Sequence, residues 1–87
     1  MSALDFFISQ VEVLNVNTES EGYNEGYNET VQEVHYGIRS GSIKSLNDLI
    51  EYIEQYDSFI EGYHNDKYRE GSQDAINQFN KYLQMMI

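Results

Sequence analysis

Residues 20–38 read SEGYNEGYNETVQEVHYGI, and this stretch decides the fold. Its apolar side chains recur every three or four positions, which is the spacing of one face of an α-helix. Its glutamates also recur every four positions and fall on the opposite face. Ser20 precedes the pattern as a candidate N-cap. The stretch therefore predicts an amphipathic helix whose apolar stripe is Tyr23, Tyr27, Val31, Val34 and Ile38.

Two later segments have the same helical period. Ser45 precedes the first, and the sequence Ser45-Leu46-Asn47-Asp48 resembles a capping box. Ser40-Gly41-Ser42 marks a break before it, and the chain has no Pro to interrupt a helix. One stripe comprises Leu46, Leu49, Ile50, Ile53, Tyr56, Ile60 and Tyr63; the other comprises Tyr68, Ser72, Ala75, Ile76, Phe79, Tyr82, Leu83 and Met86.

The N-terminal segment has two interpretations. A helix starting near Ser2 would carry Leu4, Phe7, Val11 and Leu14 on one face. Residues 11–16 are rich in β-branched side chains and are also compatible with a short strand. We favour the helix, followed by a polar connector over residues 15–19. The fold class predicted is thus all-α, a small bundle of three to four amphipathic helices.

The composition is that of one small acidic domain spanning residues 1–87. The 87 residues include no Cys, 8 Tyr and 4 Phe, and the formal net charge is −10. Without Cys there is no disulfide framework, and no apolar run approaches the length of a membrane span. The expected location is cytoplasmic. Direct binding to nucleic acid or anionic lipid is disfavoured because both repel an acidic surface.

The acids form ordered rows. No Lys or Arg occurs before Arg39, and none occurs between Lys44 and Lys67. On helices, the acids of these two stretches form rows opposite the apolar stripes. The predicted rows are Glu21, Glu25, Glu29 and Glu33 in the first stretch, and Glu51, Glu54, Asp57 and Glu61 in the second. Three of the five basic residues lie beyond position 66, so the charge should be polarised.

The rows have two explanations. They are either ordinary solvated surface or a working surface presented to a basic partner. Like charges one helical turn apart cost about 0.2–0.5 kcal/mol per pair, so a sequence selected for stability alone would alternate them with Lys. Duplex DNA carries one charge per ~1.7 Å of axis. One row of acids is several times sparser, so imitation of DNA would need two helices side by side.

Three further features bear on binding and packing. Tyr36 falls among the acids rather than on the apolar stripe, which makes it a candidate exposed anchor. Gly22 and Gly26 either permit a close approach of two helices or, if the helix begins near Glu25, leave Gly22 in the connector. Residues 25–34 also align with residues 70–79, either as two similar helices or by chance.

No motif of an enzyme or a metal site is evident. Glu61-Gly62-Tyr63-His64 has the Glu-x-x-His spacing of di-iron bundles, but His35 offers no second copy. No calcium loop, phosphate loop, zinc ligand set or nucleophile–base pair is present. We expect a protein that is not an enzyme and uses no cofactor.

In size, charge, lack of Cys and its two acidic rows, the chain resembles the small acidic inhibitors of phages and mobile elements, the anti-CRISPR and anti-restriction proteins. The resemblance implies an inhibitor whose acidic face imitates DNA and blocks the basic groove of a bacterial defence nuclease. The implied partner is a basic nucleic-acid-binding protein, with a CRISPR effector nuclease as the first choice. Carboxylates would there replace phosphates against arginine forks. The alternative is an adaptor module that forms a homodimer through Tyr-rich helix faces.

Overall fold

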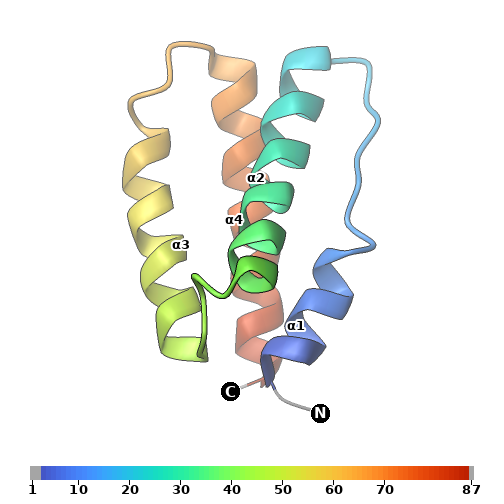
Figure 1. Cartoon of the computed structure of the whole chain (residues 1–87). Helices are drawn as coiled ribbons and strands as arrows, with labels where there is room; N and C mark the ends of the chain where they lie inside the picture. The colour runs from blue at the N-terminus through green and yellow to red at the C-terminus, as the bar shows by residue number, and fades with distance from the viewer. Residues whose placement is uncertain (1–2, 87) are drawn as a thin grey trace.

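The computed structural model describes residues 3–86, and all the regular structure in this range is helical. The helices are α1 (Ala3–Val11), α2 (Glu21–Ser40), α3 (Leu46–Ile60) and α4 (Asp66–Met86). Figure 1 shows α2 and α4 running in the same direction, with α1 and α3 running the opposite way on either side. The predicted all-α bundle is confirmed.

The predicted helix starts and stops are present. The Ser20 hydroxyl accepts a hydrogen bond from the backbone N–H of Tyr23 at 3.3 Å, and α2 begins directly after it. Gly41 ends α2 in the left-handed region at φ 87°, a conformation that glycine adopts without steric cost.

The start of α3 is a variant of the predicted capping box. Ser45 accepts from the backbone N–H of Asp48 at 3.1 Å, as that motif requires. The Asp48 carboxylate, however, accepts from the N–H of Lys44 at 3.1 Å, one residue before the cap. The reciprocal hydrogen bond of the motif therefore comes from Lys44 rather than from the N–H of Ser45 itself.

The N-terminal segment is helical but shorter than predicted. Helix α1 ends at Val11, so Leu14 lies in the connector, where it still packs against the core. Residues 11–16 form no strand. The Asn28 side chain holds the connector instead, because it accepts from the N–H of Val16 at 3.2 Å and donates to the Val16 carbonyl at 3.1 Å.

The core lies between the four helices and follows the predicted stripes. Phe7 of α1 and Phe79 of α4 are both fully buried, with ring centroids 5.8 Å apart. The other buried apolar residues are Val11, Tyr27, Val31, Val34, Ile43, Leu49, Ile53, Ile60, Ala75, Ile76 and Leu83.

Two glycines bring α2 and α4 together more closely than any other pair of helices. A Cβ on Gly26 would lie 2.0 Å from the carbonyl oxygen of Tyr68, and a Cβ on Gly71 would lie 2.1 Å from that of Tyr23. Helix α2 begins at Glu21, so Gly22 is helical as well; a Cβ there would lie 3.2 Å from the Lys67 side chain. Of the two interpretations that the sequence left open for these glycines, the close approach of two helices is the one present, at Gly26.

Buried hydroxyls fill the same crossing. Thr30 donates to the carbonyl of Gly26 at 2.7 Å, and its hydroxyl also lies 2.9 Å from that of Ser72. Ser72 donates to the same Gly26 carbonyl at 3.1 Å. Both hydroxyls are fully buried and both have partners, so their burial leaves no polar group unsatisfied.

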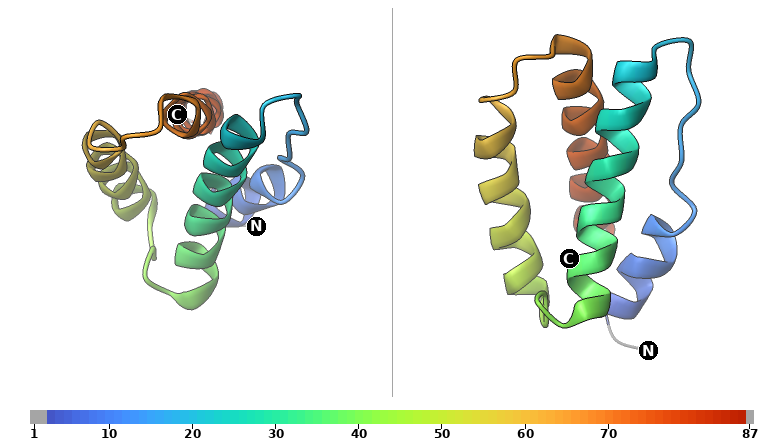
Figure 2. Two further views of the ribbon diagram at one scale, coloured as in Figure 1. Left: turned by 90° about the horizontal axis from the view of Figure 1, so that it is seen from above. Right: turned by 45° about the horizontal axis from the view of Figure 1, so that its top comes forward.

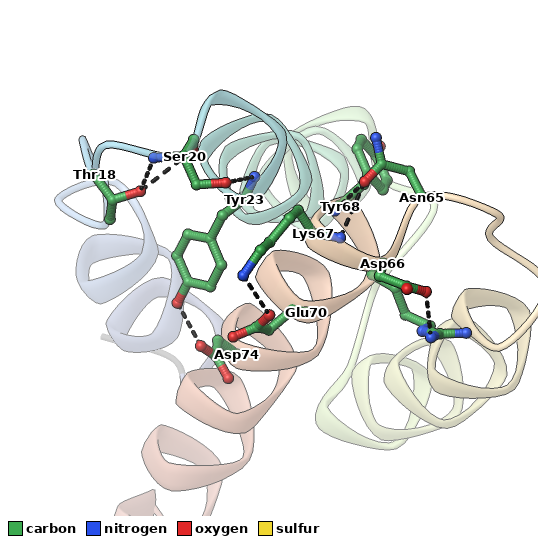
Figure 3. A network of polar contacts seen from close by, with 10 residues as sticks. Thr18, Ser20, Tyr23, Asn65, Asp66, Lys67, Tyr68, Glu70 and Asp74 are labelled. Carbon is green, nitrogen blue, oxygen red and sulfur yellow. Dashed lines mark hydrogen bonds and ion pairs between the residues drawn. The ribbon is translucent and has the colours of Figure 1, made fainter.

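The aligned segments 25–34 and 70–79 lie in α2 and α4, the two helices of this crossing. Gly26 aligns with Gly71, and each meets the backbone of the tyrosine three residues before the other. Figure 3 shows that the caps correspond too: Ser20 begins α2, and Asn65 begins α4 by accepting from the N–H of Tyr68 at 3.1 Å. The two helices are thus related by an approximate twofold axis.

Candidate functional site

The acidic row of α2 is exposed along its whole length. Glu21, Glu25, Glu29 and Glu33 are all exposed. Within residues 3–86, none of them forms an ion pair with a Lys, Arg or His side chain. Their only side-chain partners described there are hydroxyls, since Tyr68 donates to Glu29 and Tyr52 donates to Glu33. The row therefore presents uncompensated negative charge.

A groove lies between helix α3 and the C-terminal half of this row, which consists of Glu29 and Glu33. It has a volume of about 630 Å³ and is open to solvent. We call it the α2/α3 groove; its lining residues are Glu29, Gln32, Glu33 and Tyr36 of α2, Tyr56 and Phe59 of α3, Tyr63 of the following turn, and Tyr68 of α4. Seen from above in Figure 2, α3 stands apart from α2, whereas α4 lies close behind α2.

Aromatic rings in continuous contact form one wall of the groove. The ring centroids of Tyr56 and Phe59 are 6.3 Å apart, those of Phe59 and Tyr63 are 5.6 Å apart, and those of Tyr63 and Tyr68 are 4.9 Å apart. The last two pairs meet edge to face, an arrangement that the ring quadrupoles favour. Tyr52 extends the row by stacking on Tyr56. The wall is therefore supported by its own packing.

Three tyrosines of this row, Tyr52, Tyr63 and Tyr68, remain neutral hydrogen-bond donors over the physiological pH range. Burial, with the nearby Glu33 carboxylate, raises the pKa of Tyr52 to about 12. Burial and the hydrogen bond to Tyr56 raise the pKa of Tyr63, and burial and the hydrogen bond to Glu29 raise that of Tyr68. A neutral phenol beside each carboxylate leaves the negative charge on the carboxylate.

Tyrosines also hold α3 at its distance from α2. The hydroxyl of Tyr56 lies 3.5 Å from the buried Thr30 hydroxyl, so its ring spans the space between the two helices. Helix α4 meets α2 through glycines, but α3 meets α2 through phenol side chains. The difference in side-chain size produces the groove.

The structure divides the predicted site residues into two groups. Glu29, Glu33 and Tyr36 line the groove, and Glu21 and Glu25 continue the same row towards the start of α2. Tyr36 is 71% exposed, as predicted.

The predicted acids of α3 do not line the α2/α3 groove. Glu54 lies in a different depression, with Asn80 and Gln84 of α4. Glu51, Asp57 and Glu61 are exposed, and their spacing places them on the Glu54 side of the helix. The aromatic wall thus lies between the two acidic rows, which do not form one continuous surface.

Several residues that line the groove were not among the predicted site residues: Gln32, Tyr56, Phe59, Tyr63 and Tyr68. Phe59 is 65% exposed. Like Tyr36, it falls off the apolar stripe of its helix, and that signal would have identified it. Tyr68 lies on the stripe of α4, so no sequence signal distinguished it from a core residue.

Basic side chains lie elsewhere and are largely paired. At the start of α4, Lys67 pairs with Glu70 at 3.6 Å and Arg69 with Asp66 at 2.8 Å. Figure 3 shows the Lys67–Glu70 pair. Arg39 pairs with Glu12, and together with His35 it lowers the pKa of that carboxyl. Local pairing therefore neutralises much of the basic charge and leaves the α2 row unopposed.

Residues 3–86 were also compared with the requirements of a metal site and of a membrane-spanning helix. This range contains no group of three or more His, Asp or Glu side chains placed to hold a metal ion. None of its helices combines the length and the apolar character needed to cross a membrane. Comparison with protein-family models, with curated proteins and with solved structures finds no match for this chain.

Proposed function

We propose that the chain is a non-enzymatic inhibitor protein that docks the acidic surface of α2 on the basic nucleic-acid-binding surface of another protein. The target class is a bacterial defence nuclease, with a CRISPR effector as the first candidate. Inhibition follows from competition, because the bound inhibitor occupies the surface that DNA needs. The observation that carries this proposal is the exposed row from Glu21 to Glu33, which forms no ion pair with the basic side chains of residues 3–86.

The chemistry of the row supports a basic partner. Carboxylates bind guanidinium groups through charge-assisted hydrogen bonds, as phosphates do. Complementary charge also accelerates the encounter of two proteins and opposes wrong partners. The acids of α3 contribute to the same negative field at longer range. The surface that contacts the partner consists of the α2 row and the adjoining groove. It is narrower than the surface of two parallel acidic helices that imitation of DNA would need.

A charge-reversal experiment tests the proposal. The variant Glu25→Lys/Glu29→Gln/Glu33→Lys changes the α2 row, and Gln at position 29 keeps an oxygen acceptor for the Tyr68 hydroxyl. The matched control, Glu51→Lys/Glu54→Gln/Glu61→Lys, makes the same change in net charge on the other side of α3. Each protein is added to purified CRISPR effector and restriction nucleases, and DNA binding and cleavage are measured at low and high salt.

The expected result is inhibition of a nuclease by the native chain that weakens steeply as salt increases. The α2 variant should lose this inhibition and keep its helical circular dichroism, and the control should retain most of it. If no nuclease in the panel is inhibited, or if inhibition is indifferent to salt, the proposal is wrong. If both variants lose inhibition equally, net charge alone is responsible and the α2 surface has no special role.

A self-associating adaptor remains the second candidate, and the exposed rings favour it. Phe59 and Tyr36 are 65% and 71% exposed and both lie at the groove. A homodimer built on them should dissociate in the variant Phe59→Ala, as measured by light scattering, and its formation should be indifferent to salt. A native chain that is monomeric at all concentrations tested would exclude this candidate.

A further inference from the structure

The α2/α3 groove has two chemically different walls that face the same space. One is the row of rings from Tyr56 to Tyr68, and the other carries the carboxylates of Glu29 and Glu33. A site lined by π-faces and carboxylates is complementary to a cation that also has an apolar or planar surface.

One ring of this wall, Phe59, is more exposed than packing requires. Phe59 contacts Tyr56 on one side and Tyr63 on the other, yet it is 65% exposed. Phe59 lies outside the buried core, whose α3 members are Leu49, Ile53 and Ile60. Contiguous exposed apolar surface that is rimmed by polar groups is a mark of interaction sites, and the Phe59 ring is continuous with those of Tyr56 and Tyr63. Phe59 therefore serves the groove rather than the core.

Within residues 3–86, no basic side chain compensates the charge of the groove. No Lys or Arg is among the residues that line it. The described partners of Glu29 and Glu33 are the hydroxyls of Tyr68 and Tyr52, respectively. Each hydroxyl donates one hydrogen bond, and a carboxylate can accept several more. A bound cation would therefore find both charge and vacant hydrogen-bond acceptors.

We propose that this groove receives an arginine side chain from a basic segment of the partner protein, its guanidinium stacked on the Phe59 wall and hydrogen-bonded to Glu33 or Glu29. This inference rests on the proposed function, and it names the group of the partner that docks. Arginine fits better than lysine because its planar guanidinium stacks on rings, forks to a carboxylate and is weakly hydrated. An ammonium is a compact, strongly hydrated point charge that gains less from the rings.

The dimensions of the groove agree with this occupant. Its volume of about 630 Å³ lies within the range of roughly 300–1,000 Å³ found for sites that hold small ligands. Glu29 and Glu33 are one helical turn, or about 6 Å, apart along α2, so either carboxylate can meet a guanidinium that enters over the rings. The opening to solvent lets the flanking backbone of a partner segment pass.

Blocked pentapeptides test the inference on the intact chain. The probe is acetyl-Gly-Gly-Arg-Gly-Gly-amide, with versions that carry Lys or citrulline in place of Arg. Citrulline keeps the planar shape of the side chain and removes its charge. Binding is followed by two-dimensional amide NMR, which also locates the site, and by calorimetry at low salt.

The expected result is selective binding of the arginine peptide. Amide signals should shift between Glu29 and Tyr36 and between Tyr56 and Tyr63, with weaker binding of the lysine peptide and none of the citrulline peptide. Phe59→Ala should weaken arginine binding about two- to fivefold, the range of an exposed cation–π contact. Met85→Ala, which removes another exposed apolar side chain remote from the groove, should leave it unchanged.

A second pair of variants tests the carboxylate. The double variant Glu29→Gln/Glu33→Gln should weaken arginine binding, because the guanidinium can meet either carboxylate. The double variant Glu51→Gln/Glu54→Gln, which removes the same charge outside the groove, should not. Equal binding of the arginine and lysine peptides, equal effects of these two double variants, or signal shifts outside the groove would overturn the inference. Tighter binding of tetramethylammonium than of the arginine peptide would also overturn it, because the groove would then be a site for a quaternary ammonium.

Failure of this inference is distinguishable from failure of the proposed function. A chain that ignores the arginine peptide but inhibits a nuclease through Glu25 and Glu33 refutes only the inference. A chain that binds the peptide in the groove and inhibits no nuclease refutes only the proposed function.

Discussion

Gly26 and Gly71 occupy equivalent positions at the crossing of α2 and α4, and each faces the backbone carbonyl of a tyrosine in the opposite helix. The equivalence extends to the acids three residues after each glycine, Glu29 and Asp74. Tyr68 donates a hydrogen bond to Glu29, and Tyr23 donates one to Asp74. The crossing is therefore specified twice, once from each helix. Its second copy, Tyr68 with Glu29, also forms one end of the α2/α3 groove.

Alanine at either glycine should destabilise the bundle strongly. The added Cβ would lie 2.0 Å from a backbone oxygen at Gly26 and 2.1 Å at Gly71. Neither oxygen can move without its helix, so we expect a loss of about 3 kcal/mol in the free energy of unfolding, the upper end for overpacking. This loss should exceed the gain of about 1 kcal/mol that alanine brings to a helix interior. Urea unfolding followed by circular dichroism measures it.

Gly62→Ala is the control for this prediction. Its Cβ would come no closer than 3.5 Å to the nearest atom, the Phe59 carbonyl oxygen, so its unfolding free energy should change little. A Gly26→Ala protein as stable as this control would show that α2 and α4 do not approach as closely as described.

The Thr30 and Ser72 hydroxyls should be energetically coupled. Each donates to the Gly26 carbonyl and they also contact each other at 2.9 Å. Thr30→Val and Ser72→Ala should each cost about 1–3 kcal/mol, because each leaves a buried polar group with fewer partners. The double variant should cost less than the sum of the two, with a coupling of about 0.5 kcal/mol or more. Strict additivity in the unfolding free energies would contradict the network.

Stability should fall at alkaline pH because of the tyrosines. The hydrogen bond to Asp74, with burial, raises the pKa of Tyr23 to about 12, and burial beside Glu33 raises that of Tyr52 to about 12, from an ordinary value of 10.0. A folded-state pKa above the unfolded value means that the fold favours the neutral phenol. Its stabilising contribution is complete below pH 10 and is lost as the pH rises towards about 12.

Ultraviolet titration of tyrosinate checks this expectation. The native chain should show a late-ionising group of tyrosines, and Tyr23→Phe should remove one member of it. Asp74→Asn should shift Tyr23 back towards the ordinary value, because it removes the carboxylate that accepts the phenol proton. If all tyrosines of the native chain ionise together at the ordinary value, the tyrosine–carboxylate pairs are absent in solution.

Loss of the α3 cap should weaken the bundle modestly. Ser45→Ala removes the acceptor of the Asp48 N–H, and such a substitution costs about 1 kcal/mol. Ser58→Ala changes an exposed serine within α3 and should change stability little. Thermal unfolding of both variants gives the comparison, and equal melting temperatures would argue against the cap.

Much of the helical structure could be predicted because its determinants are local. The apolar stripes, the caps Ser20 and Ser45 and the break at Gly41 all act within a few residues of the backbone they specify. The N-terminal helix was harder to predict, because Val11, Val13 and Val16 favour a strand by local propensity. Burial of Phe7 and Val11 against the other helices is consistent with the helical outcome.

The candidate site was predicted in part for the same reason. Exposed acids follow the helical period, so the α2 row and the exposure of Tyr36 could be inferred from sequence. Apart from Phe59, the aromatic wall could not, because Tyr56, Tyr63 and Tyr68 lie on apolar stripes that predict core positions. Only the distance between α2 and α3 makes their rings the lining of a groove.

The sequence by itself determined that this chain forms helices and that α2 carries an ordered row of negative charge, because spacing along one helix fixes which side chains share a face. The tertiary structure decided which helices touch. Glycine against backbone carbonyl draws α4 onto α2, and phenol side chains hold α3 away from it. That choice depends on the sizes of residues 19 or more positions apart in the sequence. It separates the two acidic rows and opens the groove between α2 and α3.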